Sequence, residues 1–245
     1  NRRIILLMSR TWLIDIGNST VLYCEKTTNG FGSIVRFNTD LFNEACRRFP
    51  FKVTDYLIIS SVVPSVDPYF FAFSNAYFLT ASTVKGISVN VKVPGQIGAD
   101  RLANALGAFT AFQQSCLIID SGTALTFCYV DRKGVYQGGS IIPGMGIASQ
   151  ALQRYTAKIP LIHVQPQKML FGKTTEEAVQ VGLYNGYFHL VSGIISDYRS
   201  MDSSVKVIGT GMGLDIYENR IDLDHYIPDL ILNGLSIFSN YLVEC

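Results

Sequence analysis

The chain has 245 residues, of which 48% are hydrophobic and 16% charged, so much surface is expected to be buried between halves or between subunits. Twenty basic and nineteen acidic residues leave a net charge of +1. That balance gives no electrostatic reason to expect nucleic acid or an anionic membrane as a partner. No stretch approaches the ~18 uninterrupted apolar residues of a membrane-spanning helix, and we expect a soluble protein.

The cysteines are odd in number and form no Cys-x-x-Cys pair, which favours neither a disulfide framework nor a zinc site. They are Cys24, Cys46, Cys116, Cys128 and Cys245. This usage indicates the reduced thiols of a cytoplasmic protein. The apolar run 4–8 is too short for a signal peptide, and Met8 is either the natural start or an internal residue.

In the first half, β signals come before helical ones. Strands are predicted over 11–17, 20–25 and 32–38, with a turn at 17–19 between the first two. A helix is predicted over 40–49 with Asp40 as its N-cap, and the apolar run 53–64 is typical of a strand buried on both faces. The aromatic-rich segment 65–80 is interpreted as helix and interface core rather than a stacking platform, because no basic residues interleave with the rings.

The second half repeats this order after a clear predicted helix over 99–114. A strand over 134–144, broken by paired glycines, is followed by predicted helices over 145–156 and 174–199, the latter capped by Thr174 or Thr175. A further strand over 205–213 ends in a glycine-rich turn, and a helix follows with Pro228 in its first turn. We therefore predict an α/β fold of two similar halves, each with a mixed sheet, and a cleft between them.

One short pattern, LIDIGNST at 13–20, recurs as LIIDSGTAL at 117–125. Asp15 and Asp120 are 105 positions apart, as are Gly17 and Gly122. A strand that ends in Asp-x-Gly before hydroxyl residues can present backbone N–H groups to phosphate, while the carboxylate holds a cation. An ordinary hairpin is the alternative for either copy alone, but the repeat predicts two loops that grip the phosphate chain of a nucleotide.

The other candidate chemistry lies at 98–101, in a loop that enters a helix. Asp100 is near the positive end of the helix dipole, where it either caps the helix or acts as a base, and Arg101 could bind the carboxylate of a small acid. No P-loop, Gly-x-Gly-x-x-Gly loop or Gly-x-Ser-x-Gly elbow is present in the sequence. The histidines His163, His189 and His225 lack metal-ligand spacing and are interpreted as structural.

With these motifs in view, the sequence resembles type III pantothenate kinase, of the actin, sugar-kinase and heat-shock-chaperone superfamily. The motifs that carry the resemblance run in order along nearly the whole chain: DIGNST, SSVVP (60–64), PGQIGADRLANALGA, IDSGTALTF, GGSIIPG and GKTTEEAVQVG. The resemblance implies two duplicated ribonuclease H-like (actin-like ATPase) domains, here 1–115 and 116–245. It also implies ATP-dependent phosphorylation of pantothenate to 4'-phosphopantothenate, the first step of coenzyme A biosynthesis.

The resemblance also implies roles for individual residues. Asp100 is the expected general base, and Asp120 the ligand of an activating monovalent cation, K⁺ or NH₄⁺. The expected ATP contacts, with Mg²⁺, are Asp15, Ile16, Gly17, Asn18, Ser19, Thr20, Val21, Leu22 and Thr123. The expected pantothenate contacts are Val91, Gly98, Ala99, Asp100, Arg101 and Thr175, the last from the partner subunit of a homodimer.

Three positions depart from the family pattern. Ser19 stands where threonine is usual, Leu22 replaces a common lysine, and Val91 occupies the place of a tyrosine that touches pantothenate. The segment GTGMG at 209–213 also differs from the usual Thr-Gly-Gly. Two further hypotheses follow: a non-catalytic accessory or regulatory protein on the same fold, and a kinase of another small hydroxy acid.

Overall fold

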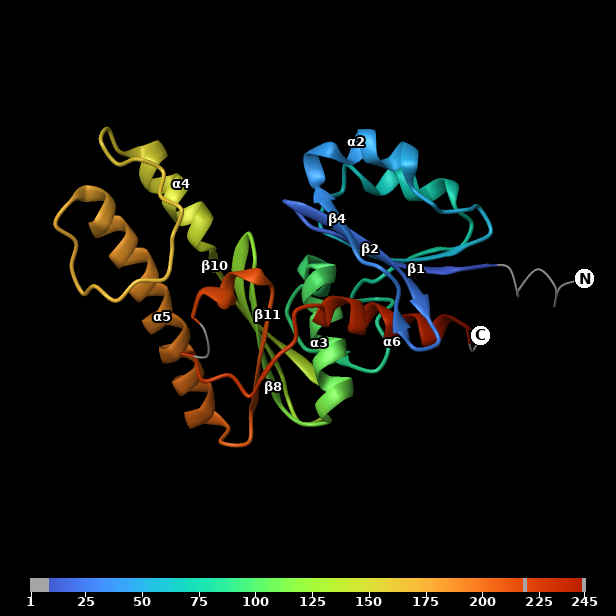
Figure 1. Ribbon diagram of the computed structural model, residues 1–245. Coiled ribbons are helices and arrows are strands. Elements are labelled where there is room, and N and C mark those ends of the chain that lie inside the picture. The colour runs from blue at the N-terminus through green and yellow to red at the C-terminus, as the bar shows by residue number, and fades with distance from the viewer. Residues whose placement is uncertain (1–8, 218–219, 244–245) are drawn as a thin grey trace, which may run out of the picture. The chain divides into compact units, whose positions relative to one another are not determined.

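The structure is a computed structural model that describes residues 9–217 and 220–243 (Figure 1). Met8 and Cys245, discussed above, lie outside the described residues. The chain divides into two compact units. The first contains the described residues up to Ala111 together with those from Leu230 onward, and the second is Phe112–Asp229.

The first unit is built on a mixed sheet. Its strands are β1 (Thr11–Ile16), β2 (Thr20–Thr27), β3 (Gly30–Phe31), β4 (Val35–Asn38), β5 (Tyr56–Ser61) and β6 (Ala76–Phe78). The order is β3-β2-β1-β5-β6, and β4 also pairs with β2. Strands β1 and β2 are antiparallel, whereas β1 and β5 are parallel. The predicted strands are therefore confirmed, and the short β7 (Ser88–Val89) follows them.

One face of this sheet carries an aromatic core. Trp12, Ile14 and Ile16 of β1 pack with Phe42 and Phe70. These two rings come from α2 (Phe42–Ala45) and from the 3-10 helix Asp67–Ala72, so the interpretation of segment 65–80 as core is confirmed for Phe70. Figure 1 shows α2 over this side of the strands.

The helix predicted over 40–49 is shorter than expected. The chain forms a 3-10 turn (Thr39–Leu41), the single α-turn of α2 and a second 3-10 turn (Cys46–Arg48). The prediction of Asp40 as N-cap is wrong, because Asn38 and Leu41 occupy the cap positions and neither makes a side-chain capping bond. The segment is held by the burial of Phe42 rather than by helix propensity, which four residues cannot supply.

Two helices complete the first unit, α3 (Ala99–Phe112) and α6 (Leu230–Val243). α6 packs on β1 and β5, on the face opposite the aromatic core (Figure 1). Lys26 of β2 also reaches α6, where its Nζ donates to Ser236 O at 3.1 Å and to Ser239 Oγ at 2.7 Å. The last helix is thus grouped with the first unit, although the sequence assigned 116–245 to one domain.

The second unit repeats the first sheet. Its strands are β8 (Cys116–Ser121), β9 (Ala124–Val130), β10 (Val135–Pro143), β11 (Lys206–Thr210) and β12 (His225–Tyr226). Within this unit the order is β12-β11-β8-β9-β10, with β8 antiparallel to β9 and parallel to β11. The two sheets share one topology, which confirms the duplication predicted from the repeated Asp-x-Gly pattern. β10 is one strand with a register shift between Tyr136 and Gly138 rather than a broken one.

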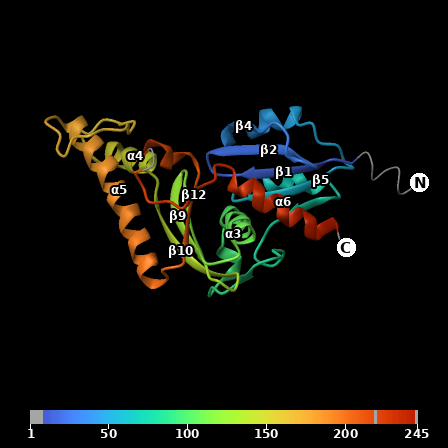
Figure 2. The same ribbon diagram turned by 60° about the horizontal axis from the view of Figure 1, so that its bottom comes forward.

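The helices of the second unit are α4 (Met145–Tyr155) and α5 (Thr175–Met201), seen side by side in Figure 2. Val191 and Ile195 of α5 pack with Leu117 and Ile119 of β8 in the core of this unit. Thr174 is the N-cap of α5, where its Oγ1 accepts from Glu177 N at 3.1 Å. In the described part of the chain, no helix has the length and apolar character needed to cross a membrane.

Candidate functional site

The first predicted phosphate loop is a tight turn between β1 and β2. Gly17 N donates to Thr20 O at 2.9 Å, and the tip residues Asn18 and Ser19 are exposed. Side chains alternate along a strand, so Asp15 faces away from the aromatic core, toward the side on which α6 packs. The turn therefore presents polar backbone and a carboxylate at one end of the sheet.

The end of β5 lies beside this turn. The parallel register places Ser60 next to Asp15 and Ser61 next to Ile16, and Val62 N donates to Ile16 O at 3.0 Å. Ser60 has no exposed surface, and within the described residues its Oγ has no hydrogen-bond partner. A buried hydroxyl of this kind usually meets an ordered water or an ion.

The predicted pantothenate loop comes next to Val62. A Cβ on Gly98 would lie 3.3 Å from Val62 Cγ1 and would overlap with Asp100 Oδ1. The missing side chain therefore lets the Asp100 carboxylate fold back at the start of α3. There Asp100 Oδ1 accepts from Arg101 N at 2.8 Å, and an Arg101 guanidinium nitrogen donates to Gln96 O at 3.3 Å.

The surroundings of Asp100 favour its neutral form. Burial raises the pKa of this carboxyl, against the opposing effect of the Arg101 amide and guanidinium. A carboxylate with a raised pKa is a better proton acceptor near neutral pH than an exposed one. Through Val62, the structure brings the Asp15–Thr20 turn and the Gly98–Arg101 loop together within the first unit.

The second predicted loop forms the equivalent turn between β8 and β9. Gly122 N donates to Ala124 O at 2.9 Å, and Gly144 N donates to Thr123 O at 3.0 Å. Asp120 lies opposite Thr210 of β11 in the parallel register. The turn is thus held by backbone bonds from two neighbouring segments.

Two residues next to Asp120 complete this turn: Gly211 of the GTGMG segment, and Tyr226, which sequence reasoning missed. Gly211 has a φ of +76°, and a Cβ there would lie 2.6 Å from Asp120 Oδ1. The Tyr226 hydroxyl donates to Gly211 O, and its pKa is raised by burial, by a hydrogen bond with Asp215 and by the charges of Asp215, Asp120 and Asp229. These carboxylates make the turn electronegative. The departure of GTGMG from the usual Thr-Gly-Gly was the sequence signal that pointed to this loop.

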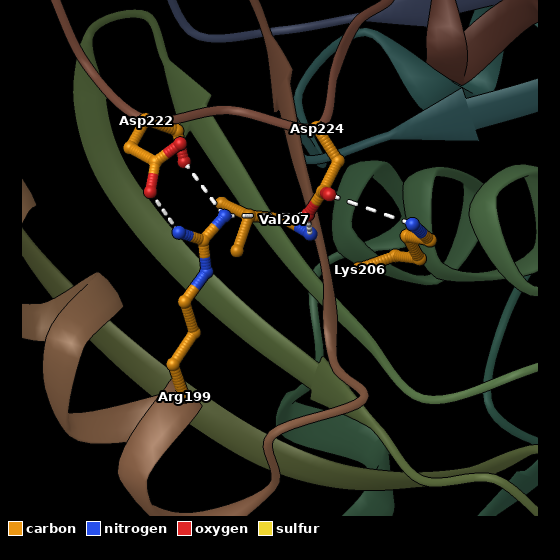
Figure 3. Close-up of polar contacts among 5 residues, drawn as sticks. All are labelled: Arg199, Lys206, Val207, Asp222 and Asp224. Carbon is orange, nitrogen blue, oxygen red and sulfur yellow. Dashed lines mark hydrogen bonds and ion pairs between the residues drawn. The ribbon is translucent and has the colours of Figure 1, made fainter.

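An ion-pair network holds the segment that carries Tyr226 (Figure 3). Arg199 of α5 pairs with Asp222 and, at 3.5 Å, with Asp224, which also pairs with Lys206 at 3.5 Å. Asp224 Oδ2 accepts from Val207 N at 2.8 Å. The network therefore fixes the segment at the start of β11, and Tyr226 farther along the segment reaches Gly211 beside Asp120.

The remaining predicted residues have different environments. Val21 and Leu22 are buried in β2, so a nucleotide at the turn would meet their backbone groups rather than their side chains. Val91 is half-buried just after β7, and Thr175 is exposed at the first position of α5. Across the described ranges, no three His, Cys, Asp or Glu side chains gather so as to hold a metal ion.

Solved structures with this fold come from several functional classes. A Campylobacter jejuni protein named for the Baf family of transcriptional activators has a TM-score of 0.66 at 19% identity, over 96% of this chain and all of that one. A Sinorhizobium meliloti protein named as a 2-dehydro-3-deoxygalactonokinase has a TM-score of 0.58 at 13% identity, over 95% and 99% of the chains. MreB5 of Spiroplasma citri bound to ADP has a TM-score of 0.53 at 11% identity, over 96% and 97%. These likenesses confirm the predicted pair of ribonuclease H-like, actin-like domains.

The sequence relatives identify a single family, whereas the solved structures identify only the fold. A type III pantothenate kinase of Thermosipho melanesiensis is 34% identical in an alignment that covers 95% of this chain and 99% of the relative. Those of Exiguobacterium sp. and Listeria monocytogenes are each 34% identical, over 86% and 74% of this chain and 84% and 73% of the relatives. The profile of the family described as type III pantothenate kinase matches residues 12–197. The chain therefore belongs to the type III pantothenate kinase family.

Proposed function

We propose that the chain transfers the γ-phosphoryl group of ATP to the primary hydroxyl of pantothenate, with Asp100 as general base. Pantothenate phosphorylation, in coenzyme A biosynthesis, is the activity of the family to which the chain belongs. The observation that carries the assignment of the base is the half-buried Asp100 carboxylate at the start of α3, beside the β1–β2 turn. The reaction takes place in the cytoplasm, as the cysteine usage predicts.

In the proposed reaction, Asp100 accepts the hydroxyl proton as the pantothenate oxygen attacks the γ-phosphorus. Gly98, Ala99 and Arg101 bind pantothenate, and the Arg101 guanidinium suits its carboxylate. A loose phosphoryl-transfer transition state makes small demands on the base, so holding the hydroxyl in line matters more than basicity. Val91, without a ring or a hydroxyl, contributes only apolar contact to the substrate.

The residues of the β1–β2 turn suit the phosphates of ATP. Gly17, Asn18 and Ser19 would donate to phosphate oxygens, with Asp15 and the buried Ser60 hydroxyl beside them as oxygen donors. Mg²⁺ in nucleotide sites takes one or two carboxylates and completes its shell with phosphate oxygens and water. The Asp15 carboxylate is therefore a suitable ligand for Mg²⁺. When bound, this ion would neutralise part of the phosphate charge.

The Asp120 turn is suited to bind a monovalent cation. Thr123 of the same turn would contact ATP. The carboxylates of Asp120, Asp215 and Asp229 lie near Tyr226, which is hydrogen-bonded to Gly211 O. A site that is lined with carboxylate and carbonyl oxygens has a negative electrostatic potential, which suits K⁺ or NH₄⁺. The motif resemblance at IDSGTALTF supports this role of Asp120.

We also propose a homodimer in which Thr175 of one chain reaches the pantothenate bound at Asp100 of its partner. Large apolar side chains are exposed on the segment before α5, with Leu170 85% and Phe171 71% exposed. Apolar surface of this kind marks sites of protein association. Because Thr175 is exposed four residues later, a partner that covers this segment would meet it.

The test is ADP release by the purified chain with ATP, Mg²⁺ and pantothenate, against panels of sugars and other small hydroxy acids. We expect pantothenate to be the preferred acceptor, and turnover in K⁺ or NH₄⁺ to exceed that in Na⁺ at matched ionic strength. A different preferred acceptor would identify a kinase of another hydroxy acid. ADP release with none of them would favour the accessory-protein alternative, and equal rates in all three salts would remove the cation role of Asp120.

A further inference from the structure

Thr39 holds both carbonyl groups that flank the tip of the β1–β2 turn. Its hydroxyl donates to Gly17 O at 2.7 Å, and its backbone N–H donates to Ser19 O at 3.1 Å. An exposed turn with no such anchor would sample several orientations of its peptide groups. Two bonds from one half-buried residue restrict the peptide groups on either side of Asn18.

The position of Thr39 follows from the register of the sheet. β4 pairs antiparallel with β2, and Asn38 at the end of β4 lies opposite Thr20 at the start of β2. The next residue, Thr39, therefore comes beside Ser19. Backbone pairing therefore places Thr39 beside the turn, within reach of the Gly17 and Ser19 carbonyl groups.

These bonds also decide which way the Asn18 amide points. In a trans peptide the C=O and the N–H of the same peptide group point in opposite directions. Gly17 O points at Thr39, so the N–H of Asn18, which belongs to the same peptide group, points away from it. Thr39 thus turns a backbone donor at the exposed tip toward the opposite side of the turn.

The duplicated turn supports the importance of this position. Gly144 lies 105 residues after Thr39, the offset that also separates Asp15 from Asp120. Gly144 follows β10 as Thr39 follows β4, and its N–H donates to Thr123 O in the second turn. Both turns are therefore held by the residue that directly follows the strand, β4 in one unit and β10 in the other, and Thr39 adds a hydroxyl bond that glycine cannot make.

We propose that Thr39 is a positioning residue for ATP, which fixes the β1–β2 turn so that the Asn18 N–H donates to a phosphate oxygen. The inference rests on the proposed function, which assigns this turn to the phosphates. Thr39 itself touches neither the nucleotide nor pantothenate. Its loss should weaken the phosphate contact and leave the nucleoside and pantothenate contacts intact.

The experiment compares Thr39→Val, which removes the hydroxyl at nearly constant shape, with Thr39→Ser, which keeps it. Binding of ATP, ADP and adenosine is measured by calorimetry without pantothenate, and Thr28→Val in the exposed turn after β2 is the control. We expect Thr39→Val to raise the Kd of ATP and ADP roughly 3- to 10-fold, the usual effect of one lost hydrogen bond. Adenosine binding and the KM for pantothenate should not change, and Thr39→Ser should bind as wild type.

Equal ATP binding by wild type and Thr39→Val would overturn the positioning role. So would an equal loss of ATP and adenosine affinity, which a merely structural defect predicts. Should Thr39→Val fail to fold, NMR of the wild type keeps the proposal testable, because the absence of an Asn18 amide shift on addition of ATP, or an equal shift with adenosine, would overturn it. Failure of the proposed function is seen separately, as a wild type that binds ATP but has no pantothenate-dependent turnover.

Discussion

At the scale of single residues, Gly98 and Asp100 compete for one volume. The carboxylate oxygen Oδ1 of Asp100 lies where a side chain on residue 98 would begin and would overlap with a Cβ there. Real Cβ atoms never overlap in this way, so the folded-back carboxylate requires glycine at 98. The neighbouring Gly95, in the same loop, has open space around its Cβ position.

We therefore predict that Gly98→Ala displaces the Asp100 carboxylate and lowers kcat, while Gly95→Ala does not. Displacement of a catalytic group by about 1 Å can cost on the order of 10²-fold in rate. Steady-state kinetics with pantothenate, together with thermal unfolding of both variants, make the comparison. Wild-type kcat in Gly98→Ala would show that the carboxylate position seen here is not the reactive one.

Asp100 itself gives a prediction with a pH signature. Asp100→Asn should lower kcat by roughly 10²- to 10⁴-fold while ATP still binds, because the proton has no acceptor. A base works when deprotonated, and burial raises the pKa of Asp100, so wild-type kcat/KM should fall on acidification at a pH above the ordinary aspartate value of about 3.9. The residual activity of Asp100→Asn should lack this acid limb. An unchanged limb in the variant would assign it to another group.

At the scale of elements, α3 carries Asp100 and is positioned by α6. The two helices approach so closely that a Cβ on Gly234 of α6 would overlap with Ala103 O. A Cβ on Gly107 of α3 would likewise lie 2.9 Å from Leu230 O. α6 in turn packs on β1 and β5, so the last helix of the chain links the start of α3 to the sheet that carries the first turn.

Gly234→Ala should therefore destabilise the fold by about 1–3 kcal/mol, as overpacking of a tight contact does. Gly193 of α5 is the matched control, because nothing lies within 4 Å of its Cβ position. There alanine should stabilise the helix by about 1 kcal/mol, the difference in helix propensity. Urea unfolding of the two variants and the wild type measures both changes in the free energy of unfolding. Stabilisation by alanine at both positions would show that the helices are not in close contact at Gly234.

The sequence predicted those elements whose cause is local. β1, β5, β8 and β11 are apolar runs with β-branched residues, and the helix over 99–114 has a clear apolar period. Segment 40–49 was predicted as a longer helix because periodicity ignores that its one buried ring, Phe42, is held by partners far along the chain. The same holds for the site. Asp15, Ser60, Asp100 and Asp120 lie in recognisable motifs, whereas Thr39 and Tyr226 reach their turns through strand pairing, which no local pattern reveals.

At the scale of the whole molecule, the exposed apolar side chains bear on the proposed homodimer. Leu170 and Phe171 are among the large hydrophobic side chains that stay exposed, close in sequence to Thr175. In a dimer with a two-fold axis, a surface that meets its own copy is used by both chains at once. Two equivalent active sites then follow, each with Asp100 from one subunit and Thr175 from the other.

The arrangement can be tested by mixing two inactive proteins. Suppose Asp100→Asn and Thr175→Ala each abolish activity, and the two variants are unfolded together and refolded. In a mixed dimer one site carries both lesions and the other carries neither. Random pairing makes about half of the dimers mixed, so activity should return to roughly a quarter of wild type by the symmetry of the interface. If Asp100 and Thr175 of the same chain shared a site, every site would carry one lesion. No recovery, with mixed dimers demonstrated by differently tagged chains, would then exclude the shared site.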